Sequence, residues 1–285
     1  MDIRELVLMA RERRASDIHI SVSHNPIFRI DGTLTETDFA LTREEKYRLI
    51  LSMLNEEQRY ASDCGEDLVV CYETGGGLRH RVNVFHQQRA LAAAIRIIND
   101  KTPTFEGLGL PDALRKLADE PHGLVLVTGP SGSGKSTTLA AIVDHINQVR
   151  ACHIITIEDP VEYIHTPKKA LIHQRDVAID VGSYARGLRS AMHEDPDVIL
   201  VGELCDYEAA SAAVIAAESG HLVLSALHTS GAAMAIDHII SFFPPHNQQQ
   251  MRTRLASALK GVVTQTLAPK AQGEGRVAAF EVMLG

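Results

Sequence analysis

The pattern of apolar and polar residues differs between the first hundred residues and the rest of the chain. Near the start, apolar residues alternate with polar ones over residues 18–22, which predicts a half-buried strand. Residues 26–32 predict a second strand that ends in an Asp-Gly hairpin turn. Further strands are expected over residues 79–85 and 92–98.

A helix is expected between these strands. Thr42 and Glu45 have the spacing of a capping box, in which two side chains accept hydrogen bonds from free N–H groups at a helix start. The apolar residues that follow recur with the helical period, at Leu49, Ile50, Met53 and Leu54. This mixture of strands and a helix predicts a small α+β domain over residues 1–100.

The second region alternates continuous apolar runs with helical patterns. Such runs are typical of strands buried on both faces of a parallel sheet, and they lie at residues 124–128, 154–157, 198–201 and 222–227. The alternation predicts a parallel α/β sheet covered by helices on both faces. Residues 101–112 interrupt the periodicity with proline and glycine, so we predict a linker there and a second domain over residues 113–285.

Residues 129–136 read Gly-Pro-Ser-Gly-Ser-Gly-Lys-Ser and connect an expected strand to an expected helix over residues 135–148, which is the context of a phosphate-binding P-loop. The glycines allow a tight turn with N–H groups pointing inward, where the helix N-terminus adds partial positive charge. Lys135 is expected to reach the β- and γ-phosphates and the Ser136 hydroxyl to bind Mg²⁺. A glycine-rich turn without a ligand is the alternative. The residues predicted to contact ATP are Gly129, Pro130, Ser131, Gly132, Ser133, Gly134, Lys135, Ser136 and Thr137.

Acidic residues directly follow the strand expected at residues 154–157. Ligands collect at the carboxyl ends of parallel strands, so we predict that Glu158 and Asp159 bind Mg²⁺ together with Ser136. The alternative is that Asp159 caps a helix beginning near Pro160, because proline is favoured in the first turn of a helix.

Glu203 follows Gly202 at the end of the strand expected at residues 198–201, the pattern of a Walker B strand. We predict that Glu203 is the general base that orients and deprotonates the attacking water, a role that contributes about 10² to 10⁴ in rate. A glutamate that only ends a strand is the alternative. Glu158 and Lys135 belong to the same predicted catalytic set.

Two histidines flank the strand expected at residues 222–227. His221 precedes it and His228 follows it, and their odd separation would point the two side chains to opposite faces of a strand. His228, at the carboxyl end, is predicted to sense the γ-phosphate or to touch a neighbouring subunit. His221 is expected to be a loop or domain-contact residue.

Composition narrows the class of protein. The chain has 285 residues, of which 45% are hydrophobic and 22% charged, as is typical of a folded globular protein. No apolar stretch reaches the roughly 18 residues of a membrane span, and no secretion signal begins the chain, so we expect a cytoplasmic protein. The net charge of −8 disfavours direct binding of nucleic acid, whose partners are usually basic.

Cysteine and histidine patterns disfavour further metal sites. The cysteines form no Cys-x-x-Cys pair, which argues against a structural zinc site and a disulfide framework; they are Cys64, Cys71, Cys152 and Cys205. The 14 histidines form no His-Glu-x-x-His cluster. We therefore predict no metal besides Mg²⁺.

Three segments, taken in order, resemble the secretion-type ATPases that drive type IV pili and type II secretion. Residues 156–163 resemble the Asp box of that family, residues 194–203 its Walker B motif and residues 220–229 its His box. Segments that resemble the pilus-retraction, or PilT-type, branch are residues 15–20, 29–32, 81–85 and 276–281. The resemblance covers nearly the whole chain and implies a RecA-like P-loop core with a smaller N-terminal α+β domain of PAS-like fold. Retraction is favoured because the longer N-terminal region and tetracysteine zinc module usual in assembly and secretion relatives do not appear.

The resemblance also implies an assembly. Family members form hexameric rings in which each N-terminal domain packs on the nucleotide core of its neighbour. Arg81 and Arg96 would then reach phosphates at the subunit interface as arginine fingers; ordinary solvated arginines are the alternative. The implied partners are an inner-membrane platform protein of the type IV pilus and, as a further candidate, an assembly ATPase. Membrane association, at the inner face of the cell membrane, is expected through partners only.

Three features depart from the family pattern. Cys205 stands where the family usually has the arginine of Gly-Glu-Met-Arg-Asp, and His193 stands where an arginine is common. The sequence ends at Gly285, before the C-terminal helical region that family members need for retraction; we expect that region to be absent either from the protein or only from this chain.

These observations predict a hexameric Mg²⁺-ATPase that powers type IV pilus retraction and twitching motility. One alternative is a related traffic ATPase for secretion, pilus extension or DNA uptake. Another is a regulatory nucleotide-binding subunit with little hydrolysis, suggested by Cys205 and His193. A small-molecule kinase is disfavoured, because a large N-terminal domain with interface arginines would have no role in it.

Overall fold

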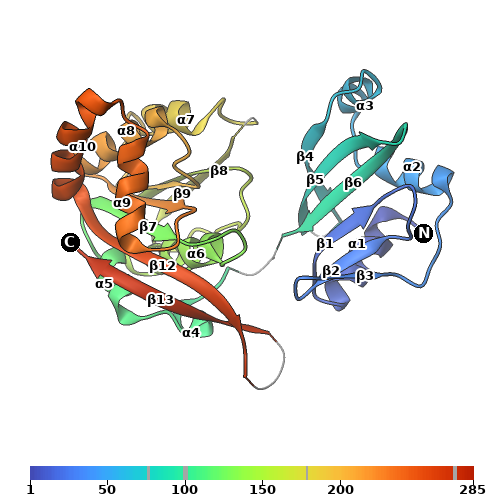
Figure 1. The fold of residues 1–285 in the computed structure, drawn as a ribbon, viewed down its shortest axis with the longest axis horizontal. Helices are drawn as coiled ribbons and strands as arrows, with labels where there is room; N and C mark the ends of the chain where they lie inside the picture. The colour runs from blue at the N-terminus through green and yellow to red at the C-terminus, as the bar shows by residue number, and fades with distance from the viewer. Residues whose placement is uncertain (76–77, 99–101, 178, 272–274) are drawn as a thin grey trace. The chain divides into compact units, whose positions relative to one another are not determined.

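The chain forms two compact units, Met1–Asp100 and Lys101–Gly285 (Figure 1). The structure is a computed structural model that describes residues 1–75, 78–98, 102–177, 179–271 and 275–285. The predicted linker begins at residue 101, which lies outside the described residues. Within the rest of that segment, α4 (Phe105–Leu108) is helical, and Phe105 is buried in the core of the second unit.

The first unit is built on an antiparallel sheet. Six of its described strands pair in the order β3-β2-β1-β6-β5-β4, and their bounds are β1 Ala15–Ile20, β2 Ile27–Ile30, β3 Thr33–Glu36, β4 Leu68–Thr74, β5 Leu78–Gln87 and β6 Ala90–Ile97. Among the described residues, three helices accompany the sheet, α1 (Ile3–Glu12), α2 (Arg43–Leu51) and α3 (Glu56–Asp63). Apolar residues of α1 and α2 pack with the inward-facing residues of the strands into one core. This is the small α+β arrangement that the sequence predicts.

Local sequence signals explain several of these elements. The capping box of Thr42 and Glu45 is present and begins α2, as predicted. The helix ends at Leu51, earlier than its apolar period suggests, yet Met53 and Leu54 are still buried in the core. The predicted Asp-Gly turn is also present, since Asp31 and Gly32 connect β2 to β3 with positive φ angles.

The second unit contains a mostly parallel sheet. Seven of its described strands pair in the order β13-β12-β7-β11-β10-β8-β9, and only β13 is antiparallel to its neighbour. Their bounds are β7 Gly123–Thr128, β8 His153–Glu158, β9 Leu171–Asp176, β10 Val198–Val201, β11 Leu222–Leu227, β12 Leu259–Pro269 and β13 Arg276–Leu284. The four strands predicted from continuous apolar runs are therefore confirmed. They are β7, β8, β10 and β11. These four strands lie side by side in the middle of the sheet, where a strand is buried on both faces.

Helices cover both faces of this sheet, as predicted (Figure 1). Apolar residues of α4, α5 (Asp112–Ala118) and α6 (Lys135–Val149) form the core on one face. Four further helices of the described residues form the core on the other face, α7 (Tyr184–Ala191), α8 (Tyr207–Glu218), α9 (Ala232–Ser241) and α10 (Pro245–Ala258). The two cores fix the central strands rigidly, so the strand ends can hold functional side chains in place.

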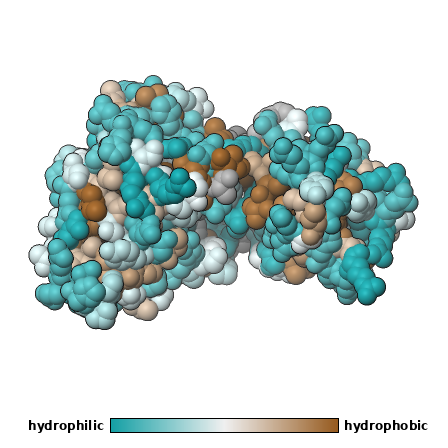
Figure 2. All heavy atoms as spheres, turned by 90° about the horizontal axis from the view of Figure 1, so that it is seen from above, coloured by the Kyte–Doolittle hydropathy of each residue, from teal (hydrophilic) through white to brown (hydrophobic). Residues whose placement is uncertain are grey.

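Hydrophilic residues make up most of the surface visible in Figure 2. Large hydrophobic side chains that are exposed come from both units, for example Tyr60 and Val69 in the first and Ile179 and Met234 in the second. Among the described helices, none combines the length and the apolar character needed to cross a bilayer.

Candidate nucleotide-binding and hydrolysis site

The register of the parallel strands brings the predicted site residues to one edge of the sheet. Thr128 at the end of β7 lies opposite Leu227 of β11, and Val201 at the end of β10 lies opposite Ser225 of β11 and Ile157 of β8. These strands therefore end together, at the edge where ligands bind to sheets of this class. The P-loop, His228 and Glu203 follow three of these strands, and Glu158 is the last residue of β8.

The P-loop adopts a backbone conformation that requires glycine. Gly129, Gly132 and Gly134 have φ angles of 146°, 75° and 88°, in the range that favours glycine. A Cβ atom on Gly129 would lie 2.2 Å from the carbonyl oxygen of Gln265. Helix α6 begins at Lys135, within the last two residues of the P-loop, so the free N–H groups of its first turn can bind phosphate.

Lys135 is buried and lies against the loop that it follows. Its Nζ atom donates to the carbonyl oxygens of Gly129 (2.9 Å) and Pro130 (3.0 Å) and lies 3.2 Å from Nδ1 of His228. Burial lowers the pKa of Lys135, and the nearby carboxylate of Glu203 opposes that shift. The ammonium group of Lys135 thus contacts both the P-loop and His228, and it lies at the centre of the predicted site.

His228 connects the lysine to the predicted general base. Its Nε2 atom lies 3.4 Å from Oε1 of Glu203. Both side chains are partly open to solvent, at 47% and 38% exposure respectively, so a water molecule can reach them. The structure therefore brings together three side chains of the predicted catalytic set, from three neighbouring strand ends.

Two buried hydroxyl groups near these residues have no partner within the described part of the chain. They are Oγ of Ser133, in the P-loop, and Oγ1 of Thr229, directly after His228. A buried hydroxyl without a hydrogen bond is costly, and a phosphate oxygen would satisfy it. The loop geometry, Lys135 and these hydroxyls thus fit a nucleotide polyphosphate.

Glu158 lies at the end of β8, beside the Glu203 segment. It is half-buried, and burial raises its pKa to about 7, while Nε2 of Gln174 donates to its carboxylate from 3.5 Å. Asp159 is exposed. The alternative of a helix capped by Asp159 is wrong, because residues 161–170, all of them described, contain no helix.

The oxygen atoms predicted to bind Mg²⁺ are of a suitable kind. Ser136 is exposed at the start of α6, and its hydroxyl and the Glu158 carboxylate are the oxygen donors that Mg²⁺ prefers. A hydrogen-bonded link joins the two regions. The hydroxyl of Thr137, next to Ser136, lies 2.9 Å from the hydroxyl of Tyr163, whose carbonyl oxygen accepts from Gln174 (2.8 Å).

Arg81 and Arg96 lie in the first unit, opposite each other on the neighbouring strands β5 and β6. On the next strand along this face, Asp17 lies 3.8 Å from Nε of Arg96 and 4.0 Å from Nε of Arg29. The two arginines predicted as fingers therefore share one face of the sheet and form part of a row of charges across it. Arg29 lies on the same face and also contacts Asp17, so it can serve as a control for substitutions of Arg81 and Arg96.

His193, Cys205 and His221 lie in segments between helices and strands of the second unit. Nδ1 of His221 donates to the carbonyl oxygen of Ala216 (2.9 Å), consistent with a loop residue at the amino end of β11. Cys205 is exposed, and its Sγ lies 3.9 Å from a carboxylate oxygen of Asp206, the N-cap residue of α8. His193 is also exposed.

Sequence reasoning missed two glutamines beside the site, the half-buried Gln174 and the buried Gln265. Gln174 of β9 contacts Glu158 and holds the segment after it. Gln265 of β12 contacts the P-loop, donating to the carbonyl oxygen of Ser133 at 2.6 Å. An available signal for Gln265 is its position at the end of the apolar run Val262-Val263, where a polar side chain must find buried hydrogen-bond partners.

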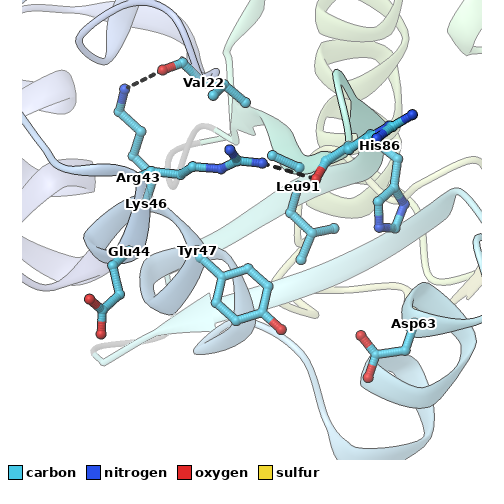
Figure 3. A pocket seen from close by; sticks show the side chains of 10 residues that line it. Val22, Arg43, Glu44, Lys46, Tyr47, Asp63, His86 and Leu91 are labelled. Carbon is cyan, nitrogen blue, oxygen red and sulfur yellow. Dashed lines mark hydrogen bonds between the residues drawn. The ribbon is translucent and has the colours of Figure 1, made fainter.

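A pocket of about 400 Å³ lies in the first unit, beside helix α2 and the turn between β5 and β6 (Figure 3). Its lysine, Lys46, donates to the carbonyl oxygen of Val22 (3.2 Å), and Arg43 donates to that of Arg89 (3.0 Å). Arg89 has a positive φ of 59° in that turn. These cations tie α2 to the adjacent backbone, so they stabilise the first unit, and we assign no ligand to the pocket.

Comparison with known proteins identifies the family. The model of the family "Type II/IV secretion system protein" matches residues 1–282. The chain belongs to this family. It is 43% identical to the type IV pilus retraction ATPase PilT of Pseudomonas aeruginosa over 286 residues, which cover 100% of this chain and 83% of that protein. It is 41% identical to a twitching motility protein of Neisseria gonorrhoeae, over 91% of this chain and 70% of that protein.

A solved structure is similar over the same length. The crystal structure of the pilus retraction motor PilT with bound ADP matches with a TM-score of 0.92 and 43% identity, covering 100% of this chain and 83% of that chain. The predictions of a secretion-type ATPase of the pilus-retraction branch, and of a RecA-like core with a smaller N-terminal α+β domain, are thereby confirmed.

Proposed function

We propose that this protein is a hexameric Mg²⁺-ATPase that powers retraction of a type IV pilus. The observation that carries the proposal is the meeting of Lys135, His228 and Glu203 at the carboxyl edge of the parallel sheet. It is supported by the similarity of the whole chain to PilT and to a twitching motility protein. The ADP bound to the PilT structure supports ATP as the nucleotide.

The side chains of the site would divide the work of hydrolysis. Glu203 would accept the proton of the attacking water, and His228, 3.4 Å away, would hold that carboxylate in place. Lys135 would place its positive charge at the end of the phosphate chain. Mg²⁺, when bound, neutralises phosphate charge, and Ser136, Glu158 and Asp159 are the residues that would hold it. A bound cation would also favour the charged form of Glu158, against the effect of its burial.

A ring would complete the site. Heterologous interfaces that close on themselves produce rings. We propose that in such a ring Arg81 and Arg96 of one subunit reach the phosphates bound by its neighbour. Nucleotide binding and release would then open and close the interface and supply the motion. The partners would be an inner-membrane platform protein of the pilus and an assembly ATPase, which would hold the motor at the cytoplasmic face of the cell membrane. We propose no direct contact with nucleic acid.

The test is the specific ATPase rate of the purified protein as a function of its own concentration, with Lys135→Ala as the blank. We expect the rate per subunit to rise steeply as subunits associate, because each site needs a neighbour's arginines. A rate that is measurable but independent of concentration, in a protein that stays monomeric, would exclude the shared site. Co-purification with a retraction-type or an assembly-type platform protein would distinguish a retraction motor from another traffic ATPase.

Cys205 and His193 favour a second candidate, a regulatory nucleotide-binding subunit with little hydrolysis. Both side chains are exposed at positions where the resemblance leads us to expect arginine, and Cys205 lies two residues after Glu203. The test is a variant with arginine at both positions. A large gain in turnover would support the regulatory role, whereas a full rate in the unchanged protein would exclude it.

A further inference from the structure

We infer that Gln265 is a positioning residue that holds the phosphate-binding loop in its nucleotide-binding shape. The inference rests on the proposal that this loop binds ATP. It adds a residue that lies 132 positions after Ser133 in the sequence and meets the loop only through the tertiary structure. Gln265 belongs to β12, the strand beside β7, and is only 3% exposed.

The side-chain amide of Gln265 joins the loop to the helix that follows it. Its Nε2 donates to the carbonyl oxygen of Ser133 at 2.6 Å, and its Oε1 accepts from the hydroxyl of Thr138 at 2.6 Å. The carbonyl oxygen of Ser133 can only accept, whereas the hydroxyl of Thr138 can donate, so the amide of Gln265 has one favourable orientation. Both halves of the amide are therefore used to fix the P-loop relative to the first turn of α6.

The backbone and side chain of Gln265 also contact the two ends of the loop. A Cβ atom on Gly129 would lie 2.2 Å from the carbonyl oxygen of Gln265, and one on Gly134 would lie 2.8 Å from its Nε2. A Cβ atom on Gly132, in contrast, would meet nothing within 4 Å. The glycines at both ends of the loop are thus required by the close approach of β12 as well as by their φ angles.

This arrangement has a direct consequence for phosphate binding. A loop that turns its N–H groups toward a phosphate turns carbonyl groups away from it, and each buried carbonyl then needs a donor. Gln265 provides that donor for Ser133. Removing it leaves a buried acceptor unpaired, which favours rearrangement of the loop. We expect nucleotide affinity to fall about tenfold, which corresponds to about 1.4 kcal/mol, within the range for a lost buried hydrogen bond.

The experiment compares substitutions in the full chain by equilibrium titration with a fluorescent N-methylanthraniloyl derivative of ATP, and by thermal unfolding without nucleotide. Gln265→Leu removes both hydrogen bonds, and Gln265→Glu keeps an acceptor for Thr138 but cannot donate to Ser133. Val262→Ala is the matched control, because Val262 is buried in the same strand but in the core on the opposite face. Thr138→Val is a milder variant that removes only the second hydrogen bond.

We expect both Gln265 variants to bind the analogue about tenfold more weakly, and Val262→Ala to lose thermal stability with unchanged affinity. If Gln265→Leu does not fold, Thr138→Val is expected to fold and to weaken binding about two- to fivefold. Affinity within twofold of the unchanged protein, in Gln265→Leu or in Gln265→Glu, would overturn the inference. Failure of the unchanged protein to bind the analogue would instead overturn the proposed function, so the two outcomes are distinguishable.

Discussion

The Nζ atom of Lys135 lies 3.2 Å from Nδ1 of His228, although the two residues are 93 positions apart in the sequence. The contact joins the P-loop to the segment after β11, and the other nitrogen of the same ring reaches Glu203. His228 is therefore in a position to couple the group that holds the phosphate to the group that would activate water.

This contact predicts the effect of His228→Ala. We expect turnover to fall about tenfold or more, because Glu203 loses its neighbour, while ATP affinity changes little because Lys135 keeps its two carbonyl partners. Steady-state ATPase rates and binding of a fluorescent ATP analogue provide the measurements. His221→Ala, at the amino end of β11, is the control and should retain turnover; an equal loss in both variants would argue against a specific role for His228.

Glu203→Gln tests the general base. The amide keeps the size of the side chain but cannot accept a proton from water, so we expect the rate to fall by about 10² to 10⁴ while ATP stays bound. Single-turnover hydrolysis together with binding measurements separates these effects. Glu208→Gln is a control on α8, where the carboxylate only pairs with Arg189 (2.5 Å). Unchanged turnover in Glu203→Gln would rule out the role assigned to it.

Gly129→Ala should damage both stability and nucleotide binding. The added Cβ would lie 2.2 Å from the carbonyl oxygen of Gln265, in a backbone conformation with φ of 146°. Either the loop or β12 must shift, since no flexible side chain can move aside. Gly220→Ala is the control, because its φ is also positive, at 104°, but nothing lies within 4 Å of the added atom. We expect a larger loss of thermal stability for Gly129→Ala, and equal losses would show that only the φ angle matters.

Stability should depend on pH through His165. Burial lowers the pKa of His165 from 6.5 to about 4, so the unfolded chain binds more protons between these two values. The stability that this residue contributes is therefore present above pH 6.5 and is lost as the pH falls through about 4, to an extent of about 3 kcal/mol. We expect His165→Gln to flatten this part of the unfolding free-energy curve measured by urea denaturation. His246→Gln, at an exposed position, is the control, and parallel curves for His165→Gln and the unchanged protein would contradict the prediction.

The arginines of the first unit provide a test of the ring. If Arg81 and Arg96 act on a neighbour's nucleotide, alanine at either position should lower turnover by about 10³ to 10⁵ without weakening ATP binding within a subunit. Arg29→Ala is the matched control, because Arg29 lies on the same sheet face and also contacts Asp17 (4.0 Å). Mixing Arg96→Ala with Glu203→Gln subunits should restore part of the activity. At some interfaces the intact Arg96 of a Glu203→Gln subunit would then face the intact Glu203 of an Arg96→Ala subunit. The absence of any recovery, with mixed rings formed, would argue against a shared site.

Much of the fold followed from the sequence because its signals are local. The four central strands of the second sheet were predicted within one residue or so, since continuous apolar runs mark strands buried on both faces. The sequence does not predict the edge strand β9 or the hairpin β12–β13 as strands, because polar residues interrupt their apolar patterns. In β9 polar residues meet solvent, whereas in β12 the polar Thr264 and Gln265 are buried. The segment after Glu158 was left open between a loop and a helix, and only its hydrogen bonds to β9, such as Val161 to Asp176 (2.6 Å), decide for a loop.

By itself the sequence determined the P-loop, the chemistry of the residues at the strand ends and the alternation that produces a parallel sheet. Glycine spacing and hydrophobic periodicity act over a few residues, so they can be read without knowing the rest of the chain. The tertiary structure alone decided that His228 meets Lys135 and that Gln265 supports the loop, because those contacts depend on which strands are neighbours and in what register. Strand order is fixed by the packing of both cores around the sheet, and no local pattern encodes it.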